Sequence, residues 1–353
     1  MDDVLTSYSD AINNLFARTT AGIKPGLERT EALLEKLGSP HRKLAAIHVA
    51  GTNGKGSVVA TCEALLRARG FTVGRYTSPH LIDFRERVTV NGKPISEAEV
   101  LTFLERWIPT AEDLGATFFE VTTVLAFDWL ASQQVDFCVI ETGLGGRLDS
   151  TNVLQPRVAT VTSIGLDHTD LLGDTLEAIA REKAGIFKPG VPAVIGEPSA
   201  QIRELLVRCA REAGADPVVA VDDNRVLEKV KVTAKGTSFT LTRNGHGHRI
   251  TTPLLGEYQA RNTATAIATL STLGDDYLPP AREISRALST VFLPGRFQRR
   301  GRFIFDVAHN PAGAWTVAKT ITDLNLPRPR TAVVAVLSDK DWRGIIRELA
   351  PAV

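Results

Sequence analysis

Residues 50–57 read Ala-Gly-Thr-Asn-Gly-Lys-Gly-Ser and combine flexible glycines with one lysine and two hydroxyl side chains. The segment follows an apolar run at 44–50 and precedes a helical pattern over 57–69, which predicts a strand, a glycine-rich turn and a helix. Such a turn presents backbone N–H groups to phosphate at a helix N-terminus. The spacing departs from the general phosphate-loop pattern, because Val49 replaces its first glycine and Gly56 its hydroxyl. A purely structural turn before a helix is the alternative.

Two side chains could complete a phosphate site of this kind. Lys55 could reach the β- and γ-phosphates of a nucleotide. Glu141 follows the apolar run 137–140, at the carboxyl end of an expected strand, where open α/β sheets build their sites. Because Mg²⁺ prefers oxygen ligands and shares them with phosphate, Glu141 is a candidate ligand, and a surface carboxylate at a strand end is the alternative.

Four further residues are ambiguous when only their types and positions are considered. Hard-cation chemistry favours Asp167 or Asp170 as a second ligand and makes His168 a loop residue. The helical pattern over 175–187 makes Lys183 a solvated helix lysine.

The elements that must position these residues alternate between strand and helix. Apolar runs at 44–50, 137–140, 158–164 and 191–195 predict strands, and helices are expected between them. This order predicts an α/β fold whose mostly parallel sheet is covered by helices on both faces. Alternating side chains over 226–252 predict a small antiparallel patch, and 257–274 predicts one helix.

The length of 353 residues favours two domains. Pro294-Gly295 marks the boundary, so we expect an ATP-binding domain at 1–293, a linker at 294–298 and a smaller Rossmann-like α/β domain at 299–353. Within that last range, 303–307 and 331–337 predict strands that flank a helix near 312–322. Because so few elements make a thin core, the second domain is expected to be incomplete.

Composition narrows the possible partners. Lys plus Arg is 41 against 40 for Asp plus Glu, a net charge of +1 that gives no general attraction to nucleic acid or anionic membranes. Cys62, Cys138 and Cys209 are far apart in apolar patterns and are expected in the core. The acidic N-terminus is not that of a signal peptide, and no apolar stretch is long enough to span a membrane, so a cytoplasmic protein is expected.

An ordered series of motifs resembles the folylpolyglutamate synthase/dihydrofolate synthase family of the Mur ligase superfamily. After the loop at 50–57, the matching strings lie at 76–81 (YTSPHL), 84–88 (FRERV), 91–92 (NG), 141–149 (ETGLGGRLD), 151–152 (TN), 167–169 (DHT), 182–186 (EKAGI), 294–297 (PGRF) and 306–311 (DVAHNP). A later match, 338–341 (SDKD), extends the resemblance over most of the chain.

The resemblance assigns roles that the residues alone leave open. It implies two magnesium sites held by Ser57, Glu141, His168 and Lys183, the last as a carbamate. It implies catalytic roles for Lys55, His168, Lys183, Arg296 and His309. The implied ATP contacts are Gly51, Thr52, Asn53, Gly54, Lys55, Gly56, Ser57, Asn262, Arg296, Asp306 and His309. The implied substrate contacts are Ser78, Pro79, His80, Phe119, Glu120, Arg147, Asp149, Asn152 and Lys340, with Lys340 a candidate for the nucleotide or the glutamate carboxylate.

The activity implied by the resemblance is ATP-dependent ligation. L-glutamate would be added to dihydropteroate, to (tetrahydro)folate or to both, through an acyl phosphate, by a protein expected to be a monomer. Two alternatives stay open. One is a Mur-type cell-wall amino-acid ligase, and the other is a nucleotide-binding fragment whose catalysis is impaired by the incomplete second domain.

Overall fold

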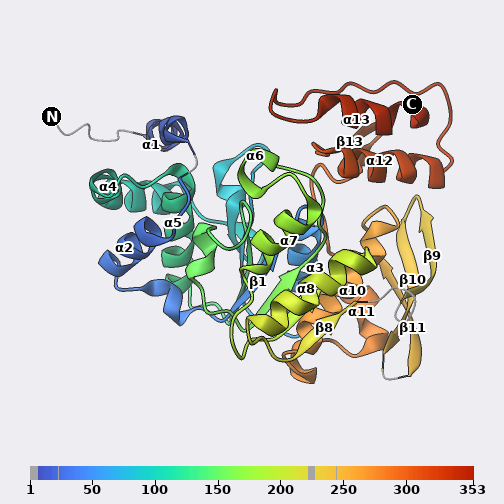
Figure 1. Ribbon diagram of the computed structural model, residues 1–353, viewed down its shortest axis with the longest axis horizontal. Coiled ribbons are helices and arrows are strands. Elements are labelled where there is room, and N and C mark those ends of the chain that lie inside the picture. Colours follow the sequence, from blue (N-terminus) through green and yellow to red (C-terminus); the bar gives the residue numbers. More distant parts are fainter. Residues whose placement is uncertain (1–6, 23, 222–226, 244) are drawn as a thin grey trace.

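The computed structural model describes residues 7–22, 24–221, 227–243 and 245–353 (Figure 1). The first residues of the antiparallel patch, its turn residue Asn244 and the acidic N-terminus lie outside the described residues. Among those described, no helix is both long enough and apolar enough to cross a membrane. Cys62 and Cys138 are buried free thiols as expected, and Cys209 is free and half-buried.

An eight-stranded sheet in the order β4-β3-β2-β5-β1-β6-β7-β8 forms the centre of the molecule. Six neighbouring strands, β2-β5-β1-β6-β7-β8, are parallel to one another. The remaining two, β3 and β4, form an antiparallel edge next to β2. Every residue of β1 and β5 is buried, as expected for parallel strands covered on both faces. The strands are β1 Ala46–Ala50, β2 Val73–Tyr76, β3 Val88–Val90, β4 Lys93–Pro94, β5 Phe137–Glu141, β6 Val158–Val161, β7 Ala193–Ile195 and β8 Val218–Ala220.

Helices cover both faces of this sheet, which confirms the predicted fold class. Ile47 and Val49 of β1 pack with α3, α10 and α11, whereas Ala46 faces α5 and Ala50 faces α7 and α8. The alternation follows from the two-residue period of a strand. The helices are α1 Tyr8–Ala17, α2 Glu28–Lys36, α3 Lys55–Ala68, α4 Glu97–Asp113, α5 Phe118–Ser132, α6 Thr169–Leu172, α7 Leu176–Ala184, α8 Ala200–Glu212, α10 Tyr258–Ser271, α11 Ala281–Leu288, α12 Pro311–Asp323 and α13 Trp342–Leu349.

The predicted antiparallel patch is a separate three-stranded sheet. It consists of β9 Leu227–Thr233, β10 Gly236–Arg243 and β11 His246–Thr252 in the order β11-β10-β9. Phe239, Leu241 and Ile250 point into the apolar cluster that also contains α3 and α10. The patch therefore packs on the helical layer rather than extending the central sheet.

The C-terminal residues gather at one corner of the molecule, drawn in red in Figure 1. A two-stranded antiparallel pair, β12 Gln298–Arg300 and β13 Phe303–Phe305, precedes α12 and α13. A small core here contains Leu255, Phe297, Ala318, Ile321 and Ala352.

The predicted strand at 331–337 is wrong. This segment has no regular structure, and Val333 and Leu337 are 97% and 74% exposed. A strand needs a neighbour to satisfy its backbone hydrogen bonds, and the described residues place no strand beside this one. Its apolar side chains gave a strand pattern, but the pairing that makes a strand is absent.

Candidate functional site

The glycine-rich turn forms a tight loop between β1 and α3. Gly51 and Gly54 have φ values of 152° and 88°. A Cβ on Gly51 would overlap the Thr162 hydroxyl, and one on Gly54 would lie 2.6 Å from Oδ1 of Asn262. Backbone conformation and crowding both require glycine at these positions, so the loop geometry is specified by its sequence.

The loop is supported from the end of β6. The Thr52 backbone N–H donates to the Ser163 carbonyl at 2.6 Å, and the Thr52 hydroxyl bonds with Gly165. The Asn53 carbonyl accepts hydrogen bonds from Thr162 Oγ1 at 2.6 Å and from Ser163 Oγ at 3.0 Å. These contacts hold the turn independently of any bound nucleotide.

Lys55 is the first residue of α3 and folds back over the loop. Its Nζ donates to the Gly51 and Thr52 carbonyls at 3.0 and 3.3 Å and lies 3.9 Å from Oε1 of Glu141. The ammonium group, the helix N-terminus and the loop amides therefore converge on one place. Together they form a site suited to the phosphates of a nucleotide.

Asn262 of α10 borders the same loop. Its side chain is buried, donates to Gln259 Oε1 at 3.1 Å and lies against the Cα of Gly54. The structure thus brings a residue more than two hundred positions away to the phosphate loop, as the resemblance implied.

Glu141 ends β5 beside the start of α3. Burial raises the pKa of its carboxyl, and the charges of Lys55 and Arg296 and a hydrogen bond from the Ser78 backbone offset part of this rise. A Cβ on Gly56 would lie 3.8 Å from Glu141 Oε2, so the carboxylate faces the first turn of α3, where Ser57 is buried. A buried oxygen donor that is not closely paired fits a hard cation.

The donor set suits Mg²⁺ shared with nucleotide phosphate. Among the described residues there is no cluster of three or more His, Cys, Asp or Glu side chains that could hold a metal ion by themselves. Mg²⁺ bound with a nucleotide needs only one or two protein ligands, since phosphate oxygens and water supply the rest. Glu141 and Ser57 are therefore sufficient from the protein side for one such ion.

Lys183 is buried, so the interpretation as a solvated helix lysine is wrong. It is 5% exposed in α7, and burial, followed by the charge of Lys55, lowers its pKa from 10.5 to about 7. The glycine loop after Glu141 covers it closely: a Cβ on Gly146 would lie 2.7 Å from the Lys183 carbonyl. With a pKa of about 7, a substantial fraction of Lys183 is the neutral, nucleophilic amine near pH 7, unlike a solvated lysine.

His168 and Asp167 lie in the loop after β6. His168 has a left-handed backbone (φ 50°), and burial lowers the pKa of its imidazole. Its Nε2 lies 3.4 Å from Lys340 Nζ. Burial alone would raise the pKa of Asp167, but hydrogen bonds from His309, Lys340 and Asn310 outweigh this and hold it well below its usual range.

Three residues expected to contact the nucleotide, Arg296, Asp306 and His309, lie in the linker and the C-terminal residues. Asp306 accepts hydrogen bonds from the backbone of Phe297 and Ala308 at 2.7 and 2.8 Å. Burial raises the pKa of Asp306, and the nearby charge of Arg296 offsets part of this rise. The charge of Arg296 also offsets part of the rise in the pKa of Glu141. His309 Nε2 lies 3.3 Å from Asp167 Oδ2.

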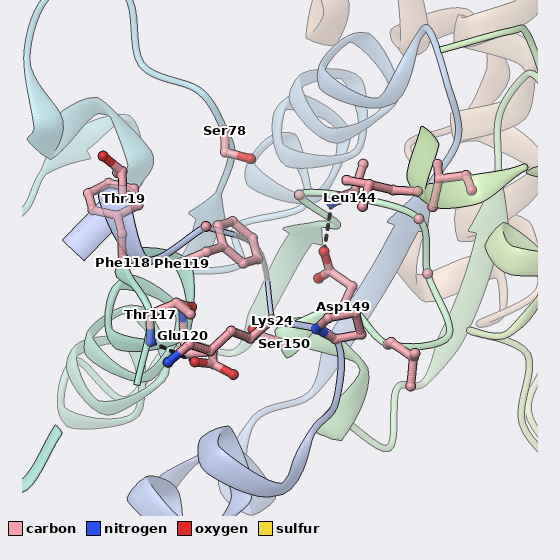
Figure 2. A pocket seen from close by; sticks show the side chains of 18 of the residues that line it. Thr19, Lys24, Ser78, Thr117, Phe118, Phe119, Glu120, Leu144, Asp149 and Ser150 are labelled. Atoms are coloured by element: carbon pink, nitrogen blue, oxygen red, sulfur yellow. Dashed lines mark hydrogen bonds between the residues drawn. The ribbon is translucent and has the colours of Figure 1, made fainter. Parts of the chain in front are cut away.

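A cavity of about 430 Å³ opens beside this centre. Figure 2 shows Phe119 at the start of α5 facing the glycine loop that carries Leu144 and Asp149. A Cβ on Gly143 would clash with the Phe119 ring, so the ring packs against bare backbone. The expected substrate residues that line the cavity are Ser78, Pro79, Phe119, Glu120, Arg147 and Asp149.

Several of these residues are also structural. Glu120 pairs with Arg29 at 2.9 Å and caps its own helix by accepting from the Thr117 backbone at 2.7 Å. The Asp149 carboxylate accepts from the backbone of Leu144 and Thr151 at 2.7 and 3.0 Å. Arg147 is the freer group, since it is exposed and pairs with Glu182 on one side only.

His80 and Asn152 lie outside the cavity lining. His80 Nδ1 accepts from Arg87 Nε at 2.8 Å, and the ring packs near Phe16 and Phe84. Asn152 donates to the carbonyls of Arg147 and Gly185, both at 3.0 Å. Their roles as substrate contacts stay predictions.

Residues at the cavity and the centre also include some that sequence reasoning missed. Arg18, Thr19 and Lys24 line the cavity but carry no motif that would indicate it. Asn310 is 3% exposed and contacts both Asn53 and Asp167. It stands in the string 306–311, in which the resemblance assigns roles only to Asp306 and His309.

Residues 49–270 match the family model described as Mur ligase middle domain. Together with the parallel sheet and the phosphate loop, this match identifies the domain as a Mur-type ATP-binding domain. The chain is 36% identical over 359 residues to the dihydrofolate synthase/folylpolyglutamate synthase of Bacillus subtilis, covering 98% of this chain and 83% of that protein. For the Escherichia coli protein of the same name the identity is 39% over 355 residues, covering 99% and 80%. The chain belongs to the folylpolyglutamate synthase/dihydrofolate synthase family of ATP-dependent ligases.

Solved structures agree with this assignment. The structure of E. coli FolC in complex with DHPP and ADP superposes with a TM-score of 0.85 at 35% identity, covering 100% of this chain and 83% of that one. Mycobacterium tuberculosis folylpolyglutamate synthase complexed with ADP gives a TM-score of 0.89 at 34% identity, covering 99% and 81%.

Proposed function

We propose that this chain uses ATP to join L-glutamate to dihydropteroate, to a reduced folate or to both, releasing ADP and phosphate. One observation carries the proposal: Glu141, which faces the phosphate loop, continues directly into the glycine loop that walls the 430 Å³ cavity. A carboxylate bound in that cavity would therefore lie next to the γ-phosphate. The names of the relatives, and the ADP-bound solved structures among them, support the same reaction.

The proposed division of labour follows the expected domains. Residues 1–293 bind ATP and the pterin acceptor, and residues 294–298 link this domain to the second one. Residues 299–353 contribute Asp306, His309 and Lys340 to the nucleotide site from the second domain. The protein acts on small molecules, without nucleic acid or membrane, as a cytoplasmic monomer. Size-exclusion chromatography with light scattering would test the last point, since a mass well above 38.2 kDa would contradict it.

Two magnesium sites and a carbamate on Lys183 belong to this proposal. Ser57 and Glu141 would hold one ion, and His168 with the carbamate of Lys183 the other. Bound Mg²⁺ would neutralise phosphate charge and orient the γ-phosphate. The support for the carbamate is the lowered pKa of Lys183, about 7, because only the neutral amine reacts with CO₂.

The chain's own groups would then promote two steps. Lys55 and Arg296 would balance the charge of the γ-phosphate while the acceptor carboxylate attacks it, giving an acyl phosphate and ADP. The neutral amine of glutamate would attack the acyl carbon, forming the amide and releasing phosphate. Packing of His309 and Lys340 over the loop would exclude water from the acyl phosphate.

Phosphate release tests the function directly. Mg-ATP and L-glutamate are supplied with dihydropteroate, with tetrahydrofolate, with a uridine-nucleotide cell-wall precursor, or with no acceptor, and the Lys55→Met variant serves as the control. Release that needs both glutamate and a pterin acceptor is expected, and the productive acceptor names the substrate. Release with the uridine nucleotide alone would show a cell-wall ligase instead, and ATP binding without any release would show that catalysis is absent.

A further inference from the structure

Asp167 connects the loop after β6 to three side chains of the C-terminal residues. Its Oδ1 lies 2.9 Å from Lys340 Nζ, and its Oδ2 lies 3.3 Å from His309 Nε2 and 3.2 Å from Asn310 Nδ2. The Asp167 and Lys340 side chains are only 9% and 11% exposed. Both carboxylate oxygens are therefore engaged by groups from the other part of the chain.

Asn310 adds a second connection at the same place. Its amide exchanges hydrogen bonds with that of Asn53 in the phosphate loop, at 3.2 and 3.3 Å. The same Oδ1 accepts from the Gly313 backbone at 2.8 Å and so caps α12. The start of α12, the phosphate loop and Asp167 are thus joined through one buried side chain.

We propose that Asp167 is a positioning residue that latches the C-terminal residues 306–341 over the phosphate loop. It places Lys340 and His309 at the nucleotide end of the sheet without itself touching substrate. The Asp167 carboxylate accepts from the Lys340 ammonium, the Asn310 amide and, at 3.0 Å, the backbone N–H of His168, and its Oδ2 also lies beside His309 Nε2. Little of its hydrogen-bonding capacity is therefore left for a ligand. The effect on turnover rests on the proposed ligase function, whereas the latch itself does not.

The consequence of removing the latch is local. Asp167 lies in the loop after β6, and its partners His309, Asn310 and Lys340 also lie outside the strands, so the central sheet does not depend on it. Replacing Asp167 with Asn keeps the shape but removes the charge that holds Lys340, because an amide accepts far more weakly from an ammonium. The C-terminal residues should then open more often while the phosphate loop stays formed.

The test combines hydrogen exchange with kinetics. The variants are Asp167→Asn, Lys340→Met, their double mutant and Asp174→Asn, which removes an exposed carboxylate from the same loop region as a matched control. In the unliganded protein, amide exchange over 306–345 is expected to accelerate in the first three variants and not in the control. The kcat/KM for glutamate should fall ~10- to 100-fold, with a smaller change in the Kd for ADP.

Coupling between the two residues decides the role. Lys340 is one of three C-terminal partners of Asp167, so the two single losses should partly overlap, and the double mutant should lose less than their product. Losses that multiply, or unchanged exchange over 306–345 in Asp167→Asn, would overturn the latch. If Asp167→Asn binds Mn²⁺ more weakly than the wild type in electron paramagnetic resonance, and its amide exchange is unchanged, Asp167 would be a metal ligand instead. A wild-type chain without turnover would defeat the ligase proposal, while the exchange data would still decide the latch.

Discussion

The phosphate loop and the neighbouring cavity of about 430 Å³ lie at one edge of the sheet but are assembled in opposite ways. The loop is one continuous run, 50–57, whose glycines, lysine and helix start are adjacent in sequence. The cavity is lined by residues from distant parts of the chain, namely 18–19, 22, 24–25, 78–79, 87, 117–120, 143–150, 171–172 and 182. A site formed by one sequence segment depends on local backbone conformation. A site assembled from distant segments depends on which of its side chains are free of structural hydrogen bonds and packing. Substitutions can separate these two cases.

The largest effect should come from Lys55→Met. The substitution removes the ammonium group that folds back over the loop while keeping a side chain of similar length. Loss of this charge should lower kcat by ~10²- to 10³-fold. Steady-state phosphate release measures the loss, and an unchanged circular dichroism spectrum shows that the fold persists. A variant with near-normal turnover would remove Lys55 from the mechanism.

The second-largest effect should come from Lys183→Met, which tests the role of this buried lysine beneath the glycine loop. A ~100-fold loss of turnover is expected, without loss of stability because the side chain is already buried. In the wild type the neutral amine, and with it the carbamate, should increase as the pH rises through about 7, the lowered pKa of Lys183. NMR with ¹³C-labelled bicarbonate should show a carbamate signal that the variant lacks. A wild-type spectrum without that signal would contradict the carbamate.

Gly54→Ala tests whether local backbone rules govern the loop. The new Cβ would force strain at φ 88° and crowd Asn262 Oδ1 at 2.6 Å. A cost of about 1–3 kcal/mol is expected, seen as weaker ADP binding in calorimetry. Gly56→Ala is the matched comparison, because its Cβ would meet Glu141 only at an ordinary 3.8 Å. Equal losses in both variants would show that backbone strain is not the cause.

Phe119→Ala should separate the cavity from the loop. Removing the ring that packs against Gly143 should raise the KM for the pterin acceptor ~10-fold, because a flat apolar contact is lost. The Kd for ADP should not change. An equal effect on ADP would mean that the two sites are not independently assembled.

Glu120→Gln should have the smallest effect on turnover and a visible one on stability. Glu120 is 1% exposed and is committed to Arg29 and to the cap of α5. The substitution should cost about 1–3 kcal/mol of unfolding free energy in a denaturant titration, since Arg29 loses its partner charge. The acceptor KM should change less than in Phe119→Ala. The reverse ranking would make Glu120 a substrate contact.

Most of the fold could be predicted because local patterns act over a few residues. The apolar runs at 44–50, 137–140, 158–164 and 191–195 each coincide with a strand of the central sheet, and β9, β10 and β11 form the antiparallel patch that was expected. The exception at 331–337 has the same apolar character but lacks a neighbouring strand, which no local pattern reveals.

The sequence by itself determined the glycine turn of the phosphate loop, because the positive φ values at Gly51 and Gly54 and the helix start at Lys55 belong to one short segment. Only the tertiary structure decided that Lys183 is buried and that Asn310 reaches the loop residue Asn53, 257 positions away. The physical reason is that burial and electrostatic pairing depend on which distant surfaces meet. Contacts between distant parts of the chain lower the pKa of Lys183 and give Asp167 its hydrogen-bond partners. In the sequence alone, nothing distinguishes these two residues from any other lysine or aspartate.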